Sequence, residues 1–494
     1  MTRRIKWMAR RRAGALMPVF SLPGAYGIGT LGRSAYEFID FICEAGLSYW
    51  QVLPLGPAGK GYSPYSSPSS FAGNPLFIDW ELAGQRFGGD IVPAKPASLP
   101  GRIDYASLSR QSDCVLRRAF ARMDNDAAAS VRHFAESRAW LADYALYEAI
   151  RADDTRQWHE WPEPLKRRDP SALSLARDRL RSQIDYHAFA QWLFFEQWSA
   201  VKAYANERGV AIVGDTPIYA ALNSADVWAD PGQFQLDDDL SPTEISGCPP
   251  DFFNADGQLW ENPLYRWDVM ERDGYDWWTR RLGAAAEMFD VTRIDHFRGF
   301  EAYYAIPSGA STARGGRWRP GPGYPFFERI KKALSDPEVI AEDLGDITPG
   351  VRKLLKRTGY PGMKVLQFAF DPDADSDYLP HKYERNCAVY TGTHDNDTSK
   401  GWYDGISAKE RRFFRLYTNM GRLASPSWSM IRAAWSSAAN TAIAPMQDFL
   451  ELGGDCRVNV PGVADGNWGW RVREGLLTYG LAKKIRAITE LYGR

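Results

Sequence analysis

The sequence is poor in the residues that hold metal ions and cross-links. It has only five cysteines and six histidines in 494 residues. No two cysteines have the C-x-x-C spacing of a zinc site, and no histidines form an H-E-x-x-H pair. We therefore expect reduced thiols, a reducing compartment and no metal site.

The chain also lacks an excess of charge and a long apolar run. Its 60 lysines and arginines balance 61 aspartates and glutamates, so the formal net charge is −1. This balance gives no electrostatic footprint for nucleic acid or a membrane surface, and no run approaches the roughly 18 apolar residues of a membrane span. Six of the first twelve residues are basic, but no apolar signal-peptide core follows. We expect a cytoplasmic protein.

Aromatic residues, in contrast, are abundant. The chain contains 19 Trp, 24 Tyr and 24 Phe residues. Flat apolar rings with a polar group can stack on sugars or bases, but they also fill protein cores, and composition does not separate these uses. The length suits either a barrel enlarged by insertions or two to three domains.

Short apolar runs predict buried parallel strands. The first two, at 14–21 and 49–53, enclose a helix that begins at Ser34, where Glu37 has the capping-box spacing, and ends before Gly46. Further runs lie at 210–214, 289–294, 339–342, 364–370, 388–391 and 442–446. Eight strands, most of them followed by polar or acidic residues, are typical of a (β/α)₈ barrel. In this α/β fold the strands' carboxyl ends form the active site.

The spacing of these strands predicts insertions into one catalytic barrel over residues 1–494. The connection after the second strand is far too long for an ordinary loop, and it contains Trp140, Tyr144 and Tyr147 at helical spacing. We predict a largely helical insertion over 56–208 and a smaller one, rich in Gly and Pro, over 216–288. A helix near 475–492 leaves no room for a C-terminal β-sandwich domain.

Three strand ends carry carboxyl groups suited to catalysis. Arg293 and Asp295 lie two residues apart and should share one face, where the arginine would keep the carboxylate ionised as a nucleophile. A purely structural ion pair is the alternative. Glu342 could be a general acid and base, or a helix cap. Asp395, beside His394, could equally belong to a turn.

Taken together, these three carboxyl groups favour one chemistry. Acidic residues at the ends of the fourth, fifth and seventh strands would converge on one cavity. Retaining glycoside chemistry requires two such groups, a nucleophile and an acid/base, about 5–5.5 Å apart.

Longer motifs carry a resemblance to a known family. The sequence resembles the 4-α-glucanotransferases called amylomaltases or disproportionating enzymes, glycoside hydrolase family 77 of the α-amylase clan. The resemblance extends from about Ala13 to Arg471. It rests on SLPGAYGIGTLG, WQVLPLGP, YSPYSSPSSFAGNPLFID, GDTPIY, CPPDFF, LWENPLY, RIDHFRGFEAYYAIP, AEDLG, GTHDNDT and RVNVPG…NWGWR.

The resemblance implies the catalytic roles. Asp295 matches the nucleophile and Glu342 the acid/base. Asp395 matches the carboxylate that holds the 2- and 3-hydroxyls of the sugar and stabilises the transition state. Arg293 and His394 match residues that hold the nucleophile and the sugar in the −1 subsite.

Four more residues are implied as substrate contacts. Tyr65 matches the stacking tyrosine of the −1 subsite, with a core or turn tyrosine as the alternative. Asp215 matches a sugar-contacting aspartate, although it could instead close the loop of the third strand. Trp260, with the loop 248–253, matches the acceptor side or else a core tryptophan. Asn459 is a further candidate.

The chain departs from the family pattern at two positions near the acceptor subsites. Cys248 precedes the Pro-Pro of the acceptor loop, and Glu261 stands where glycine is usual. These departures put the acceptor preference in doubt rather than the reaction.

The resemblance implies an enzyme that moves a segment of an α-1,4-glucan to the 4-hydroxyl of another glucan or of glucose. Its partners would be malto-oligosaccharides and glucans derived from starch or glycogen, with no cofactor. An α-amylase-like or α-glucosidase-like hydrolase is the alternative, since the carboxyl groups alone do not separate transfer from hydrolysis. A non-catalytic glucan-binding protein is a second alternative, which the intact carboxyl groups disfavour.

Overall fold

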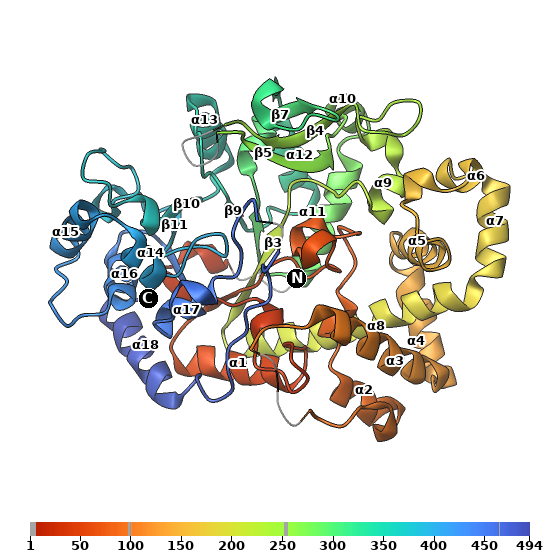
Figure 1. Cartoon of the computed structure of the whole chain (residues 1–494), viewed down its shortest axis with the longest axis horizontal. Coiled ribbons are helices and arrows are strands. Elements are labelled where there is room, and N and C mark those ends of the chain that lie inside the picture. Colours follow the sequence, from red (N-terminus) through yellow and green to blue (C-terminus); the bar gives the residue numbers. More distant parts are fainter. Residues whose placement is uncertain (1–5, 97–98, 100, 251–254, 464) are drawn as a thin grey trace.

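The fold is a closed barrel of parallel strands surrounded by helices (Figure 1). We describe it from a computed structural model, for residues 6–96, 99, 101–250, 255–463 and 465–494. The strand order around the barrel is β1-β12-β11-β10-β9-β6-β3-β2. The strands are β1 Arg12–Leu16, β2 Tyr49–Gln51, β3 Ala211–Thr216, β6 Val291–Ile294, β9 Val339–Ala341, β10 Gly362–Val365, β11 Cys387–Tyr390 and β12 Thr441–Pro445. The predicted barrel is confirmed.

Each of the eight predicted strands is present, but two of them are displaced. The first covers Arg12–Leu16 rather than 14–21, because the chain turns into a 3₁₀-helix at Val19–Ser21. The sixth is displaced in the same way. It covers Gly362–Val365 rather than 364–370, because the chain turns into a 3₁₀-helix at Leu366–Phe368. Gly362 has no Cβ, and one placed there would lie 2.6 Å from the Asp343 carboxylate. Glycine at this position therefore leaves room for the neighbouring Asp343 side chain.

The capping box predicted at Ser34 was wrong. Helix α1, Arg33–Glu44, begins after Gly32 and has no side-chain cap. The Ser34 hydroxyl instead donates to the Thr30 carbonyl at 3.1 Å. The predicted end is confirmed, because Gly46 follows α1 with a φ of +67°, a backbone conformation that glycine adopts readily.

One end of the barrel is closed by the N-terminal segment. Trp7 packs against the apolar side chains that fill the barrel interior. The backbone N–H groups of Trp7 and Met8 donate to the two carboxylate oxygens of Glu338, at 2.7 and 3.1 Å. Because Glu338 directly precedes β9, this closed end lies at the amino ends of the strands.

Helices cover the outside of the barrel and form a large group beside it. Between β2 and β3 the chain forms helices α2 to α8, which gather on one side of the molecule (Figure 1, orange to yellow). They are α2 Trp80–Phe87, α3 Tyr105–Ala121, α4 Asn125–Glu136, α5 Leu141–Asp153, α6 Glu163–Lys166, α7 Pro170–Arg179 and α8 Arg181–Glu207. In α8, the longest of these helices, the Trp198 ring N–H donates to the Met288 carbonyl at 3.0 Å.

The remaining helices follow β3 and the later strands. Gly475, where the final helix was predicted to begin, precedes the observed start of α18 by four residues. These helices are α9 Ala225–Ala229, α10 Trp267–Arg272, α11 Asp276–Met288, α12 Gly323–Ala333, α13 Pro349–Thr358, α14 Ser399–Gly405, α15 Ala408–Tyr417, α16 Pro426–Ser436, α17 Met446–Phe449 and α18 Tyr479–Leu491. Among the described residues, none of the helices has both the length and the apolar character of a membrane span.

A second, antiparallel sheet that the sequence did not predict stands beside the barrel. Its order is β5-β4-β7-β8, which leaves β5 at an edge. The strands are β4 Glu244–Cys248, β5 Gln258–Pro263, β7 Ala302–Pro307 and β8 Arg317–Pro320. Since β7 follows β6 closely, the sheet lies near the carboxyl ends of the barrel strands.

Candidate active site

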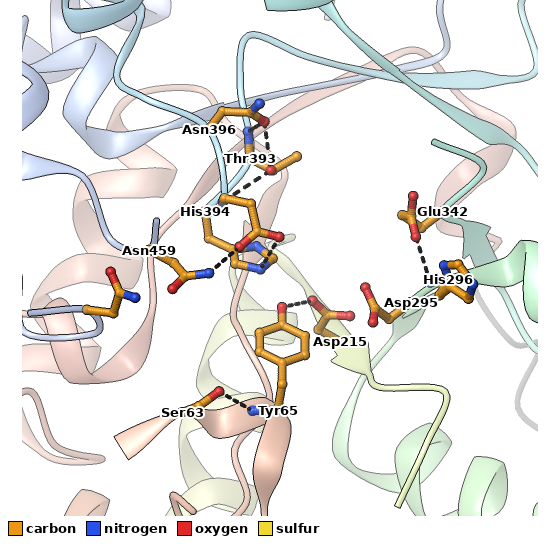
Figure 2. A network of polar contacts seen from close by, with 12 residues as sticks. Ser63, Tyr65, Asp215, Asp295, His296, Glu342, Thr393, His394, Asn396 and Asn459 are labelled. Carbon is orange, nitrogen blue, oxygen red and sulfur yellow. Dashed lines mark hydrogen bonds and ion pairs between the residues drawn. The ribbon is translucent and has the colours of Figure 1, made fainter. Parts of the chain in front are cut away.

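Polar side chains from four strands meet at the open end of the barrel, the end formed by the carboxyl ends of the strands. Asp215 lies near the end of β3, Asp295 follows β6, Glu342 follows β9, and His394 and Asp395 follow β11. Figure 2 shows Asp215, Asp295, Glu342 and His394 directed into one region. The structure thus gathers the acidic residues that the sequence singled out as catalytic.

Arg293 is the positive centre of this group. Its Nη1 lies 2.7 Å from Oδ1 and 2.8 Å from Oδ2 of Asp215, and 2.9 Å from Oδ1 of Asp295. Its side chain is only 5% exposed, so solvent screens these contacts weakly. Arg293 and Asp295 therefore face each other, as their spacing of two residues predicts.

Asp215 is held entirely by the protein. Its side chain is fully buried. Besides Arg293, it accepts a hydrogen bond from the Tyr65 hydroxyl at 2.7 Å (Figure 2). Both carboxylate oxygens thus have protein donors, and this geometry fits a residue that positions Arg293 and Tyr65.

Arg293 lowers the pKa of Asp295, as its position beside this carboxylate predicts, but it does not act alone. Burial raises the pKa of Asp295 above the ordinary range of an aspartate and outweighs the effect of Arg293. The negative charges of Asp215, Glu342 and Asp395 raise this pKa further. The sequence spacing predicts the contact between Arg293 and Asp295, but it does not predict the other carboxylates that lie nearby.

Glu342 is held by two backbone amides. The His296 N–H donates to Oε2 at 2.6 Å, and the Leu344 N–H donates to Oε1 at 2.9 Å. His296 has a φ of +46°, an uncommon left-handed conformation that begins a sharp turn after β6. Burial raises the pKa of Glu342 against the charge of Arg293 and these two hydrogen bonds.

Asp395 is oriented by a separate set of contacts. Asn459 Nδ2 donates to Oδ1 at 2.6 Å, and His394 Nε2 lies 3.3 Å from Oδ2. The Asn459 backbone N–H also donates to the His394 carbonyl at 3.1 Å. With its side chain 44% exposed, Asp395 presents its carboxylate to solvent at the open end.

Aromatic rings surround these contacts. The Tyr65 ring stacks on the His394 ring, with centroids 5.1 Å apart and an interplanar angle of 13°. Trp468 lies 5.8 Å from Tyr65 and 6.0 Å from His394. Trp468 was not among the predicted site residues, although its N-W-G-W-R motif is the signal that could have identified it.

Trp260 connects this site to the second sheet. It lies on β5, and its ring meets the His296 ring edge-on at 4.9 Å. Cys248, the first residue of the predicted acceptor loop 248–253, ends β4. Residues 251–253 of this loop lie outside the described residues.

Other acidic residues that follow barrel strands do not join the site. Asp343 accepts a hydrogen bond from the Met363 N–H at 2.6 Å, on the β10 side. Asp448 accepts from the Thr391 and Ser399 hydroxyls, and Asp371 is exposed at a turn. A place at a strand end is therefore not sufficient for membership of the site.

The parts of the chain that the structure describes contain no group of three or more His, Cys, Asp and Glu side chains arranged to hold a metal ion. The chemistry available at the open end is that of paired carboxyl groups. One, Asp295, touches an arginine, and the other, Glu342, is held by backbone amides.

Comparison with known proteins identifies the family. Residues 17–478 match the family model described as 4-alpha-glucanotransferase. The chain is 45% identical to the 4-alpha-glucanotransferase of Thermus thermophilus over 493 residues, which cover 97% of this chain and 98% of that protein. It is 43% identical to the enzyme of Clostridium butyricum over 489 residues, 97% of this chain and all of that protein.

A solved structure agrees. The amylomaltase of Streptococcus agalactiae, solved in complex with acarbose, superposes with a TM-score of 0.95 at 37% identity, over 98% of this chain and 100% of that one. Fold, site and sequence therefore agree that this chain belongs to the 4-α-glucanotransferases of glycoside hydrolase family 77.

Proposed function

We propose that this 4-α-glucanotransferase works by a retaining double displacement in which Asp295 is the nucleophile and Glu342 the acid/base. Asp295 attacks the anomeric carbon of a bound α-1,4-glucan while Glu342 gives its proton to the departing 4-oxygen. This step leaves a β-linked glycosyl-Asp295 and a shortened glucan. Glu342 then takes the proton from the 4-hydroxyl of an incoming glucan or glucose, which displaces Asp295 and restores the α linkage.

The contrast between the two carboxyl groups carries this assignment. Asp295 contacts the Arg293 guanidinium at 2.9 Å, whereas Glu342 accepts from neutral backbone amides only. Two interacting carboxyl groups titrate as a pair, and the single shared proton favours the group without a direct cationic partner. In our proposal that proton resides on Glu342, which leaves Asp295 ionised for attack.

The remaining residues hold the sugar. Asp395 would accept hydrogen bonds from the 2- and 3-hydroxyls, with Asn459 and His394 fixing its orientation. Tyr65 would stack against the sugar in the −1 subsite. We propose that Asp215 acts mainly through Arg293 and Tyr65, since a direct sugar contact would require one of these partners to move.

Trp260 would receive the acceptor. An acceptor sugar stacked there is held beside the intermediate, and a held acceptor reacts at a high effective concentration. Exclusion of water by the surrounding rings would also protect the intermediate from hydrolysis. These two effects favour transfer over hydrolysis.

The product profile from pure maltotriose tests the proposal. Transfer gives glucose and a ladder of longer oligosaccharides, while the total number of reducing ends stays nearly constant. Chromatography and a reducing-end assay measure both. If reducing ends rise steadily and no product exceeds maltotriose in length, the enzyme is a hydrolase.

We also propose that the natural substrates are malto-oligosaccharides from starch or glycogen and that the protein works in the cytoplasm. The acarbose bound to the Streptococcus agalactiae amylomaltase supports the first part, and the few, scattered cysteines support the second. Cell fractionation followed by immunoblotting tests the location, and recovery in an exported fraction would contradict it.

A further inference from the structure

Lys60 and Glu261 meet beside the open end of the barrel. Lys60 Nζ lies 3.3 Å from Glu261 Oε2. Lys60 begins the short turn Lys60–Tyr62, which leads to Tyr65, and Glu261 lies on β5 directly after Trp260. The ion pair thus joins the loop that carries the stacking tyrosine to the strand that carries the acceptor-side tryptophan.

Glu261 keeps this contact in an unfavourable backbone conformation. Its φ is +63°, a region in which a side chain clashes with the backbone and glycine is the usual residue. A glycine would relieve the strain but would also remove the carboxylate that reaches Lys60.

The two partners belong to separate parts of the fold. The Lys60 turn is attached to the helical insertion, because the Tyr62 ring stacks on Tyr105 of α3 at 4.5 Å and 13°. Glu261 belongs to the edge strand of the antiparallel sheet. Both side chains are well exposed, at 86% and 66%, so salt weakens their attraction strongly.

We propose that Lys60 and Glu261 form a clasp that discriminates between glucan acceptors by length. This inference rests on the proposed function, in which the acceptor passes Trp260 with its 4-hydroxyl directed at Asp295. Glucose ends beneath the clasp and leaves it intact. A long acceptor continues past Trp260 and has to separate Lys60 from Glu261.

The expected effect is modest because an exposed ion pair is weak. Its usual strength corresponds to a change of about 1.4-fold to 5-fold in a rate or binding constant. The clasp should reduce transfer to long acceptors by this factor in low salt and leave transfer to glucose unchanged.

The experiment compares two acceptors with one donor. Alpha-maltosyl fluoride serves as donor, and glucose or maltoheptaose as acceptor, at 20 and at 500 mM NaCl. The measured quantity is the ratio of the kcat/KM values for maltoheptaose and for glucose, from quantified transfer products. The variants are Lys60→Gln, Glu261→Gln, Glu261→Gly and the double variant with glutamine at both positions.

A matched control lies at the other end of the barrel. Lys6 and Asp336 form an ion pair of 3.7 Å with similarly exposed side chains, 73% and 55%. The variant Lys6→Gln should retain the wild-type ratio and its salt dependence.

In the wild type, high salt should raise the ratio by about 1.4-fold to 5-fold. Both glutamine variants should show the raised ratio already in low salt, and the double variant should add nothing further. Folded glutamine variants that keep the wild-type ratio and salt response would overturn the clasp, as would a change confined to Glu261→Gly. A wild type that forms no transfer product with either acceptor would instead overturn the proposed function, and the clasp with it.

Discussion

The two ends of the barrel accommodate charged side chains in opposite ways. At the closed end, the Glu338 carboxylate receives one backbone N–H on each oxygen, beside the apolar Trp7. At the open end, Asp215, Asp295 and Glu342 surround the single guanidinium of Arg293, and burial raises the pKa values of Asp295 and Glu342. The closed end satisfies its charge with hydrogen bonds, whereas the open end keeps negative charge in excess.

This difference indicates what each end is for. Hydrogen-bonded and apolar groups stabilise the folded state, and their loss is costly. Crowded carboxyl groups instead favour the uptake of a proton, which is the property a general acid needs. Substitutions at the open end should therefore change the reaction, and substitutions at the closed end should change stability.

The largest effect is expected for Asp295→Asn. Transfer from maltotriose should fall by about 10⁴-fold or more, because an amide cannot form the covalent intermediate. Activity assays measure this loss, and thermal unfolding should show that the variant remains folded. Asp371→Asn, which changes an exposed carboxyl after β10, should behave as wild type, and near wild-type turnover of Asp295→Asn would exclude Asp295 as nucleophile.

Glu342→Gln should have the next largest effect. Transfer from glucans should fall by about 10²-fold to 10⁴-fold, since the leaving group loses its proton donor. A glycosyl fluoride needs little acid assistance, so it should glycosylate Asp295 and leave a trapped adduct that intact-mass spectrometry detects. The same variant combined with Asp295→Asn should show no adduct. Absence of added mass on Glu342→Gln alone would contradict the assignment.

Trp7→Ala tests the closed end. Removal of this buried ring should lower the free energy of unfolding by about 3–5 kcal/mol, measured by urea denaturation. Transfer activity per folded molecule should stay within about two-fold of wild type, since no reacting group lies at this end. Leu423→Ala, at a fully exposed side chain, is the control. An activity loss as large as that of Asp295→Asn would contradict the proposal that the closed end contributes to stability and not to the reaction.

Tyr65→Phe removes one hydroxyl from the open end. The hydrogen bond to Asp215 is lost while the ring can still stack on His394. We expect kcat/KM for maltotriose to fall by about 10-fold, the usual cost of leaving a buried acceptor short of one donor. The control Tyr62→Phe, which changes an exposed ring, should leave kcat/KM for maltotriose nearly unchanged. An unchanged kcat/KM in Tyr65→Phe would show that the hydroxyl does not help to position Asp215.

The smallest effect is a pH dependence of stability. Burial and mutual repulsion raise the pKa values of the coupled pair Asp295 and Glu342 above those of unfolded side chains, which titrate near 3.9 and 4.3. Between the unfolded and the raised pKa values the folded pair binds a proton that the unfolded chain has released, so the free energy of unfolding falls as the pH rises through this window.

Asp295→Asn removes one carboxylate of this pair and should weaken the pH dependence, because Glu342 then loses a repelling negative charge. Relative to wild type, its free energy of unfolding should rise by on the order of 1 kcal/mol between pH 5 and pH 8. Denaturant unfolding at several pH values measures the difference. A constant difference across this range would contradict the raised pKa.

The sequence predicts the barrel well because its strands are buried on both faces. Such strands appear as continuous apolar runs, and β3 and β12 are buried at every residue. The antiparallel sheet escaped prediction because its edge strands, β5 and β8, have almost no buried residues and lack a continuous apolar run. In β8, for example, the run Arg317–Pro320 contains two arginines and no buried residue.

The site was predictable only in part. Neighbours such as Glu342 and Asp343 look equivalent in the sequence, yet one turns into the site and the other toward β10. The resemblance to the family assigns the catalytic role to Glu342, whereas the position at the end of a strand does not distinguish it from Asp343. The raised pKa of Asp295 depends on side chains from distant strands, and the contact between Lys60 and Glu261 joins residues about 200 positions apart. Local sequence patterns therefore predict neither the raised pKa nor this contact.

The pairing of β1 with β12 has a consequence for synthesis on the ribosome. Arg12 finds its partner Thr441 only after nearly the whole chain has been made. At roughly 5–20 residues per second, the first strand leaves the ribosome about 20–90 s before the last one is available. During this interval β1 exposes an unpaired edge to other nascent chains. We expect newly made chains to depend on chaperones until the final strand emerges.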